Sequence, residues 1–166
     1  MVIIIKLSTC NIRHLLITLI LFSFLICQSD QITLKKNEFK RHNLSIGMFD
    51  DKTGISMISY TYNKQMNEMN EYFIGVGSML FAFTGSIGWK HYLYKNSKNS
   101  IYSVLSQQIV THIGFTGYMP TVSLTLEHKL KWFKIKTGFI ALFIFRIDED
   151  KEEFGVLPFL SLNFDF

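Results

Sequence analysis

The sequence predicts an all-β fold, and three observations support this fold class. After residue 30, no segment repeats its apolar residues with the period of a helix, whereas segment after segment alternates apolar and polar residues. The chain has 16 Phe and 7 Tyr but only 2 Pro, a composition that favours extended, half-buried strands. Clusters of Asn, Asp, Lys, Gly and Ser separate the alternating segments, as turns between strands require. The 166 residues are enough for one domain.

Residues 1–29 have the pattern of a secretory signal peptide. Lys6 and Arg13 precede a short apolar run, Leu15 to Ile26, and cleavage after Ser29 would leave small residues just before the cut. Two alternatives stay open. One is a retained transmembrane anchor, although the run is shorter than the roughly 20 apolar residues of a spanning helix. The other is a lipid on Cys27, although the residue before it is bulkier than usual for such a site.

Cleavage after Ser29 would remove both cysteines of the chain, Cys10 and Cys27. The mature protein would then have neither a thiol nor a disulfide, unlike most small secreted domains. It would keep 15 of the 17 basic residues and all 13 acidic ones, because Lys6 and Arg13 leave with the segment. This small net charge does not indicate a nucleic-acid partner.

The rest of the chain divides into a polar lead-in, residues 30–42, and a predicted β-barrel, residues 43–166. The alternating segments of this barrel number eight. They are Asn43 to Phe49, Ile55 to Tyr62, Tyr72 to Phe81, Ser86 to Tyr94, Ile101 to Val110, Thr121 to His128, Trp132 to Phe145 and Phe154 to Phe166. Strands this evenly spaced, joined by short connections, predict an antiparallel up-and-down arrangement.

The predicted connections are rich in residues that tolerate turn conformations. "DDKTG", Asp50 to Gly54, is expected to be a tight hairpin loop, and "NKQMNEMNE", Asn63 to Glu71, a longer polar one. The other connections are "KNSKNS", Lys95 to Ser100, "GFTGYMP", Gly114 to Pro120, and "DEDKEE", Asp148 to Glu153. Glycines inside the strand patterns, as in "IGVG" and "GSIGW", indicate curvature or close approach.

The alternation leaves open which face of the sheet meets solvent. In Thr121 to His128, for example, Val122, Leu124 and Leu126 share one face and Ser123, Thr125 and Glu127 the other. A soluble sandwich would bury the apolar face, whereas a membrane barrel would turn it toward lipid. The signal peptide and the absence of cysteines after it favour the barrel. Aromatic residues at predicted strand ends favour it too, because such residues form belts at membrane interfaces.

The last residues carry the most specific pattern. Leu160, Leu162, Phe164 and Phe166 lie on one face of the final strand, and small or polar residues lie on the other. This pattern resembles the C-terminal strand of bacterial outer-membrane barrels, in which a terminal aromatic residue and alternating apolar residues are recognised by the barrel assembly machinery. The resemblance implies that Phe166 ends an assembly signal and that the last strand pairs with the first. Pro158 is expected near the outer end of this strand, where a missing N–H costs least.

The wider pattern is similar to the small eight-stranded outer-membrane barrel proteins. This resemblance implies a transmembrane barrel in the outer membrane, in contact with its lipid. One feature departs from these proteins: the longer loop, Asn63 to Glu71, falls on the periplasmic side, and the short one, Asp50 to Gly54, on the outer side. An adhesin or receptor is therefore not expected.

The sequence predicts no catalytic, cofactor or metal site. Enzymes on eight-stranded barrels act on lipid A or phospholipid acyl chains, and the deacylases among them carry His and Ser two residues apart. Here the histidines at 42, 91, 112 and 128 are followed two positions later by Leu44, Leu93, Gly114 and Leu130. No two histidines have metal-ligand spacing either.

One lumen cluster is predicted. Glu127 and Lys134 lie on neighbouring strands and are expected to face each other inside the barrel, with Lys136 one step along. Charges in so narrow a space must pair, so the cluster is expected to plug the lumen. The sequence thus predicts a non-enzymatic envelope protein with a structural or interaction role. The alternatives are a lipid-modifying barrel enzyme, a porin-like conducting barrel, and a secreted or periplasmic barrel that binds an apolar ligand.

Overall fold

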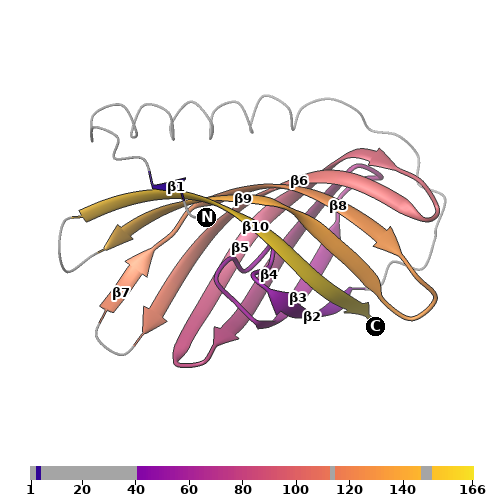
Figure 1. Ribbon diagram of the computed structural model, residues 1–166. Coiled ribbons are helices and arrows are strands. Elements are labelled where there is room, and N and C mark those ends of the chain that lie inside the picture. Colours follow the sequence, from indigo (N-terminus) through magenta and orange to yellow (C-terminus); the bar gives the residue numbers. More distant parts are fainter. Residues whose placement is uncertain (1–2, 5–40, 113–114, 147–150) are drawn as a thin grey trace.

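A computed structural model describes residues 3–4, 41–112, 115–146 and 151–166. The predicted signal peptide and lead-in, apart from residues 3, 4, 41 and 42, lie outside the described residues. In the part that the structure describes, all regular elements are strands of one antiparallel sheet (Figure 1). The all-β prediction is therefore confirmed.

The strand bounds are as follows: β1 (Ile3–Ile4), β2 (His42–Met48), β3 (Ile58–Gln65), β4 (Asn70–Met79), β5 (Ala82–Lys95), β6 (Asn99–His112), β7 (Phe115–Tyr118), β8 (Thr121–Lys129), β9 (Lys134–Arg146) and β10 (Lys151–Asp165). Each of the eight predicted strands overlaps an observed one. The bounds differ by zero to four residues at each end, as expected where turn residues extend a ladder by one or two pairs.

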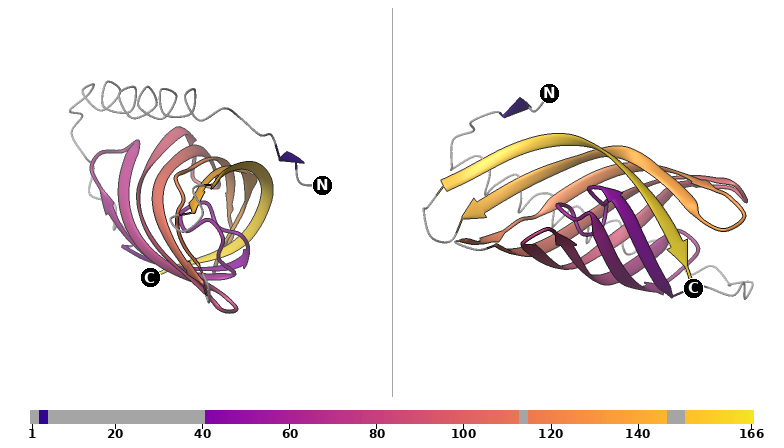
Figure 2. Two further views of the ribbon diagram at one scale, coloured as in Figure 1. Left: turned by 90° about the vertical axis from the view of Figure 1, so that its left-hand side faces the viewer. Right: turned by 60° about the horizontal axis from the view of Figure 1, so that its bottom comes forward.

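The hydrogen-bonded pairing of the strands closes into a ring. It runs from β2 through β3, β4 and β5 to β6, then through β7 and β8 to β9, and finally through β10 back to β2. At the closing seam, the backbone N–H groups of His42 and Phe166 each donate to the other residue's carbonyl oxygen, over 3.1 and 3.0 Å. Viewed nearly end-on, the strands surround the connection between β2 and β3 (Figure 2, left).

The predicted turn at Gly114 to Pro120 is wrong in part, because it contains strand β7. Both β7 and β8 pair with β6 on one side and with β9 on the other, so they share one position in the ring. Pro120 has no N–H to give to the ladder, and the strand is interrupted there. Pairing continues across the interruption, since the Met119 N–H donates to the Gln108 carbonyl and the Phe143 N–H donates to the Pro120 carbonyl.

The strands are strongly staggered around the ring. Paired residues lead from Phe164 through Leu44, Tyr60, Val76, Gly85, Ile109, Tyr118 and Phe145 to Glu152, which lies in the same strand twelve residues earlier. With ordinary strand spacing and rise, this stagger corresponds to a tilt of about 45° and a backbone radius of about 9 Å. A smaller stagger with the same strands would give a narrower ring.

The wall of the ring is shorter where β2 and β3 form it, because these strands have fewer residues than the others around them. These strands have 7 and 8 residues, whereas β10 has 15. β2 pairs with β10 only between Leu160 and Asp165, so Pro158 lies beyond this pairing and its ladder partner is Phe139 on β9. Its missing N–H therefore leaves no gap in the seam.

Candidate functional site

The ring carries polar side chains inside and apolar side chains outside. On β8, Ser123 and Thr125 are buried, whereas Leu124 between them is 52% exposed. On β4, Val76 is 60% exposed, and on β9 Phe139 is 62% exposed. A water-soluble sheet distributes its side chains the other way. The interior is therefore where the polar chemistry of this protein lies.

The connection between β2 and β3 folds into this interior. Asp50, Asp51, Lys52 and Thr53 are all buried, with exposures of 0 to 3%. The tight hairpin loop predicted on the outer side at Asp50 to Gly54 is thus wrong in its location, although Asp50 and Gly54 do form a bridge with two backbone hydrogen bonds of 3.0 and 2.8 Å. We call residues 49–57 the inserted loop. Phe49 and Gly54 have positive φ angles of 65° and 60°, and these turn the chain inward and back.

Asp50 holds the inserted loop in shape. Its carboxylate accepts hydrogen bonds from Ser45 Oγ on β2 at 2.9 Å and from Ser59 Oγ on β3 at 3.1 Å. It also accepts from the Thr53 backbone N–H at 3.2 Å and from Thr53 Oγ1 at 3.0 Å. One buried carboxylate therefore joins the loop to both strands that flank it.

Asp51 connects the inserted loop to the opposite wall. Its carboxylate forms an ion pair with Lys136 Nζ on β9 at 3.1 Å and accepts a hydrogen bond from Thr125 Oγ1 on β8 at 3.5 Å. Burial alone would raise the pKa of Asp51, but the charges of Lys136, Lys52 and Lys90 outweigh it and hold the pKa well below its usual range. Asp51 is therefore an anion deep inside the ring.

Lys52 is the cation of the inserted loop. Its ammonium group donates to Asn63 Oδ1 on β3 and lies 5.3 Å from the centre of the Phe73 ring. Burial, followed by repulsion from Lys136 and Lys90, lowers the pKa of Lys52 to about 8. Lys52 is thus less firmly charged than an ordinary lysine.

A series of ion pairs crosses the interior at the end of the ring where Asp165 lies. Lys90 on β5 lies 4.0 Å from Glu71 and 3.9 Å from Glu127. Lys134 lies 3.5 Å from Glu127 and 2.6 Å from Asp165. The ammonium group of Lys90 also lies over the rings of Tyr102 and Tyr92, at 3.7 and 4.2 Å. These charged groups pair with one another across five strands, β4, β5, β8, β9 and β10.

In the structure, Glu127 and Lys134 form an ion pair, whereas Lys136 pairs with a different carboxylate. Lys136 is the backbone partner of Glu127 in the β8–β9 ladder, yet its ammonium group reaches Asp51. Sequence reasoning missed the residues that complete the network: Asp50, Asp51, Lys52, Glu71 and Lys90. Lys90 had a usable signal, because it continues the alternate positions of Thr84 and Ser86 on β5, which are also buried. The sequence contains no such signal for Asp50, Asp51 and Lys52, because charged loop residues are ordinarily exposed to solvent.

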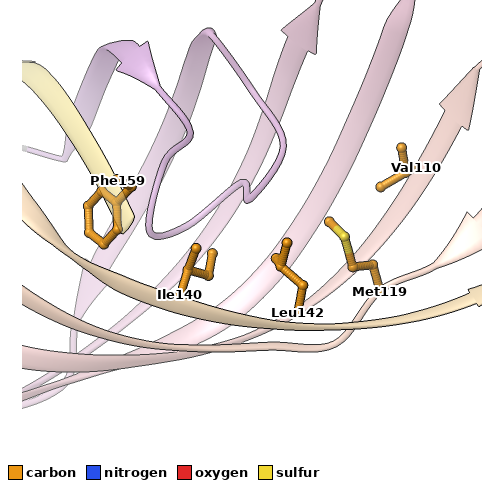
Figure 3. Packing of buried hydrophobic residues seen from close by; sticks show 5 residues of the cluster. All are labelled: Val110, Met119, Ile140, Leu142 and Phe159. Atoms are coloured by element: carbon orange, nitrogen blue, oxygen red, sulfur yellow. The ribbon is translucent and has the colours of Figure 1, made fainter. Parts of the chain in front are cut away.

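Apolar residues occupy the other part of the interior. Five of them form a buried cluster: Val110, Met119, Ile140, Leu142 and Phe159. Figure 3 shows their side chains on one side of the strands, facing the region of the inserted loop. Phe49 and Ile55, at the two ends of that loop, pack against this cluster. The loop is therefore anchored by apolar contacts at its base and by charges at its tip.

The predicted assembly residues lie on the outside of the closing strand. Leu160, Leu162 and Phe166 are exposed, and Phe164 is half-buried. β10 pairs with β2, as the resemblance implied for the last and first strands. The ring of Phe166 stacks on His42, with centroids 5.9 Å apart.

Comparisons with known proteins do not assign the chain to a family or a function. No family model, no curated protein and no solved structure matches the chain. Within the described ranges, no helix is long and apolar enough to cross a membrane. Among the same residues, no group of three or more His, Cys, Asp or Glu could hold a metal ion.

Proposed function

We propose that this protein is a transmembrane β-barrel of the bacterial outer membrane with a non-enzymatic, structural or interaction role in the envelope. The inverted distribution of side chains carries the proposal. Exposing residues such as Val76, Leu124 and Phe139 to water costs hydrophobic free energy, whereas exposing them to hydrocarbon does not. The same arrangement keeps serines, threonines and charges away from lipid.

The closed pairing supports the proposal independently. Hydrocarbon offers no hydrogen-bond partners, so a sheet that crosses a membrane must pair its backbone groups around a ring. The seam between His42 and Phe166 completes such a ring. Barrels close with their strands tilted and staggered, as these strands are.

Aromatic residues on the outer face fit the boundaries of a bilayer. Trp132 is 79% exposed in the connection between β8 and β9, and Tyr94 is exposed near the end of β5. Phe81 and Phe83 are exposed at the other end of β5. Amphipathic and aromatic side chains concentrate at both membrane interfaces in barrels.

In this proposal, an N-proximal segment serves export and the outer face of β10 serves assembly. Residues 1–29 act as the signal peptide, and the face of β10 formed by Leu160, Leu162, Phe164 and Phe166 is recognised by the barrel assembly machinery. Outer-membrane lipid is the lasting partner. The inserted loop fills the interior, so the resting protein is a sealed cylinder and not an open porin.

An arginine scan of the outer face tests the proposal. Val76→Arg places a charge near the middle of β4, where lipid contact should lower the free energy of unfolding by about 2–4 kcal/mol. The matched control is Ser97→Arg in the exposed connection between β5 and β6, which should change it by less than about 0.5 kcal/mol. Urea unfolding in lipid vesicles measures both. Equal, small effects at the two positions would mean that water surrounds β4 and would refute the proposal.

A further inference from the structure

The ring is wide enough to hold a segment of polypeptide. Side chains of the wall alone are just able to fill an ordinary eight-stranded ring. Here the interior also contains the backbone of the inserted loop, with Asp51 and Thr53 fully buried inside it. The twelve-residue stagger accounts for the extra width, because greater tilt enlarges the circumference. Without the loop, the part of the interior that its backbone and side chains occupy would be empty.

The strands around the inserted loop contribute polar side chains of their own to the interior. Asn163, Ser161, Thr61, Ser86 and Ser123 are buried, yet each has a side-chain polar atom without a hydrogen-bond partner in the described part of the chain. Buried groups of this kind are satisfied by water. The wall therefore suits a hydrated lumen as well as a packed one.

The loop is held in place by separable contacts. Asp51 and Lys136 form the ion pair that joins the tip of the loop to β9. Phe49 and Ile55 pack at its base, next to the strands it connects. Breaking the ion pair would therefore remove the charged contact between the tip and β9, while the hydrogen bonds of Asp50 and the apolar contacts at the base remain. A buried ion pair that loses one partner destabilises its site strongly, because the other charge stays unpaired.

We propose that the inserted loop is a plug and that the ring conducts small ions when the loop leaves the interior. The permeant species are inorganic ions, since the wall around the tip of the loop presents charges and hydroxyl groups. Lys136 would line the opened lumen and help to set its selectivity. The inference rests on the proposed function, because conduction requires that the ring cross a membrane.

Removing the loop tests the inference while leaving the wall intact. In the register of the ladder, Met48 lies opposite Ser56, so replacing Phe49–Ile55 with Asn-Gly gives a two-residue hairpin. In a planar lipid bilayer with KCl, this variant should show conductance steps at least about tenfold larger than those of the wild type. Adding Lys136→Glu to it should shift the reversal potential toward that of potassium.

A matched change at the other end of the ring controls for shortening a loop. Residues 66–69 join β3 to β4, and replacing the last three of them with Asn-Gly should leave the conductance at the wild-type level. Asp51→Asn keeps the whole loop but removes its charge, so it should produce intermittent openings of the same size as those of the loop-free ring. A loop-free ring that still migrates faster before boiling in detergent but does not conduct would overturn the inference.

Two further outcomes are decisive. If the loop-free chain does not fold, the Asp51→Asn variant provides the test. An Asp51→Asn ring that folds but does not conduct overturns the inference that the loop is a plug. If instead the wild-type protein remains water-soluble and does not insert into vesicles, the membrane proposal itself fails. Folded variants that insert and stay silent refute the plug alone.

Discussion

At the scale of single residues, Lys52 is the least favourably placed charge of the interior. It is 3% exposed, its pKa is lowered to about 8, and its ammonium group faces Asn63 and an aromatic ring. Asp51, next to it, has the opposite character, because three lysines stabilise its carboxylate. The inserted loop therefore combines a favourable anion with a costly cation.

The titration of Lys52 leads to a prediction on alkaline stability. Between pH 8 and the ordinary lysine value of 10.5, the unfolded chain binds a proton that the folded chain has released. Stability rises with pH wherever the unfolded state binds more protons. The free energy of unfolding, measured with urea in detergent micelles through Trp fluorescence, should therefore gain a rising contribution in this window. Lys52→Met should remove that contribution, and an unchanged slope in the variant would contradict the assignment.

Asp51 acts at the acid end of the pH scale, where its contribution to the free energy of unfolding also rises with pH. Its folded pKa lies below the ordinary aspartate value of 3.8. The stability that it contributes is complete above that value and is lost as the pH falls below it, because the unfolded chain then binds the proton first. Acid and mild alkali therefore affect the same loop through neighbouring residues.

At the scale of elements, the contact between β2 and β10 depends on a glycine. A Cβ on Gly47 would meet the Leu160 carbonyl oxygen and would lie 2.5 Å from the Ser161 Cα. These are backbone atoms, so the clash cannot be relieved by turning a side chain. The closing seam therefore requires a residue without a side chain at this position of β2.

Gly47→Ala should accordingly weaken closure of the ring. We expect a loss of about 1–3 kcal/mol in the free energy of unfolding, since overpacking forces the backbone to shift. Gly85→Ala on β5 is the control, because a Cβ there has nothing within 4 Å. Urea titrations of the two variants should separate clearly. Equal stability of both would show that β2 and β10 are less tightly joined than the structure indicates.

The strands were predictable from sequence, whereas the inserted loop was not. Thr121 to His128 was expected and Thr121–Lys129 is found, because alternation reports directly which residues face the interior. Glu127 and Lys134 could be assigned to the interior for the same reason. Asp50 to Gly54 has ordinary turn composition, and its burial depends in part on distant partners, Ser59 at 9 positions from Asp50 and Lys136 at 85 positions from Asp51. Local patterns contain no information about such partners.

Pro120 shows a second limit of sequence patterns. The segment from Gly114 to Pro120 has turn residues at both ends, yet its middle is strand β7. Pairing with β6 and β9 on both sides outweighs the local preference of these residues. Tertiary pairing thus extended the wall of the ring by one short strand.

At the scale of the whole molecule, the ring should behave as one cooperative unit in the membrane. We expect the mature protein to stay with the outer-membrane fraction after extraction with urea or carbonate. We also expect faster migration in detergent gels before boiling than after, because the closed ring resists detergent. Gly47→Ala should lower the temperature at which the two bands interconvert. Release with the periplasmic contents would contradict the membrane location.

The seam also sets the order of events during biosynthesis. The side chains of Asn43 and Asp165, which are hydrogen-bonded over 2.5 Å, are separated by 122 positions in the chain. Until Leu160 to Asp165 have been synthesised, β2 has no neighbour on one side, and long-range pairing of this kind forms slowly. A chain that lacked Leu160 to Asp165 would thus leave β2 with an unpaired edge that is open to other strands.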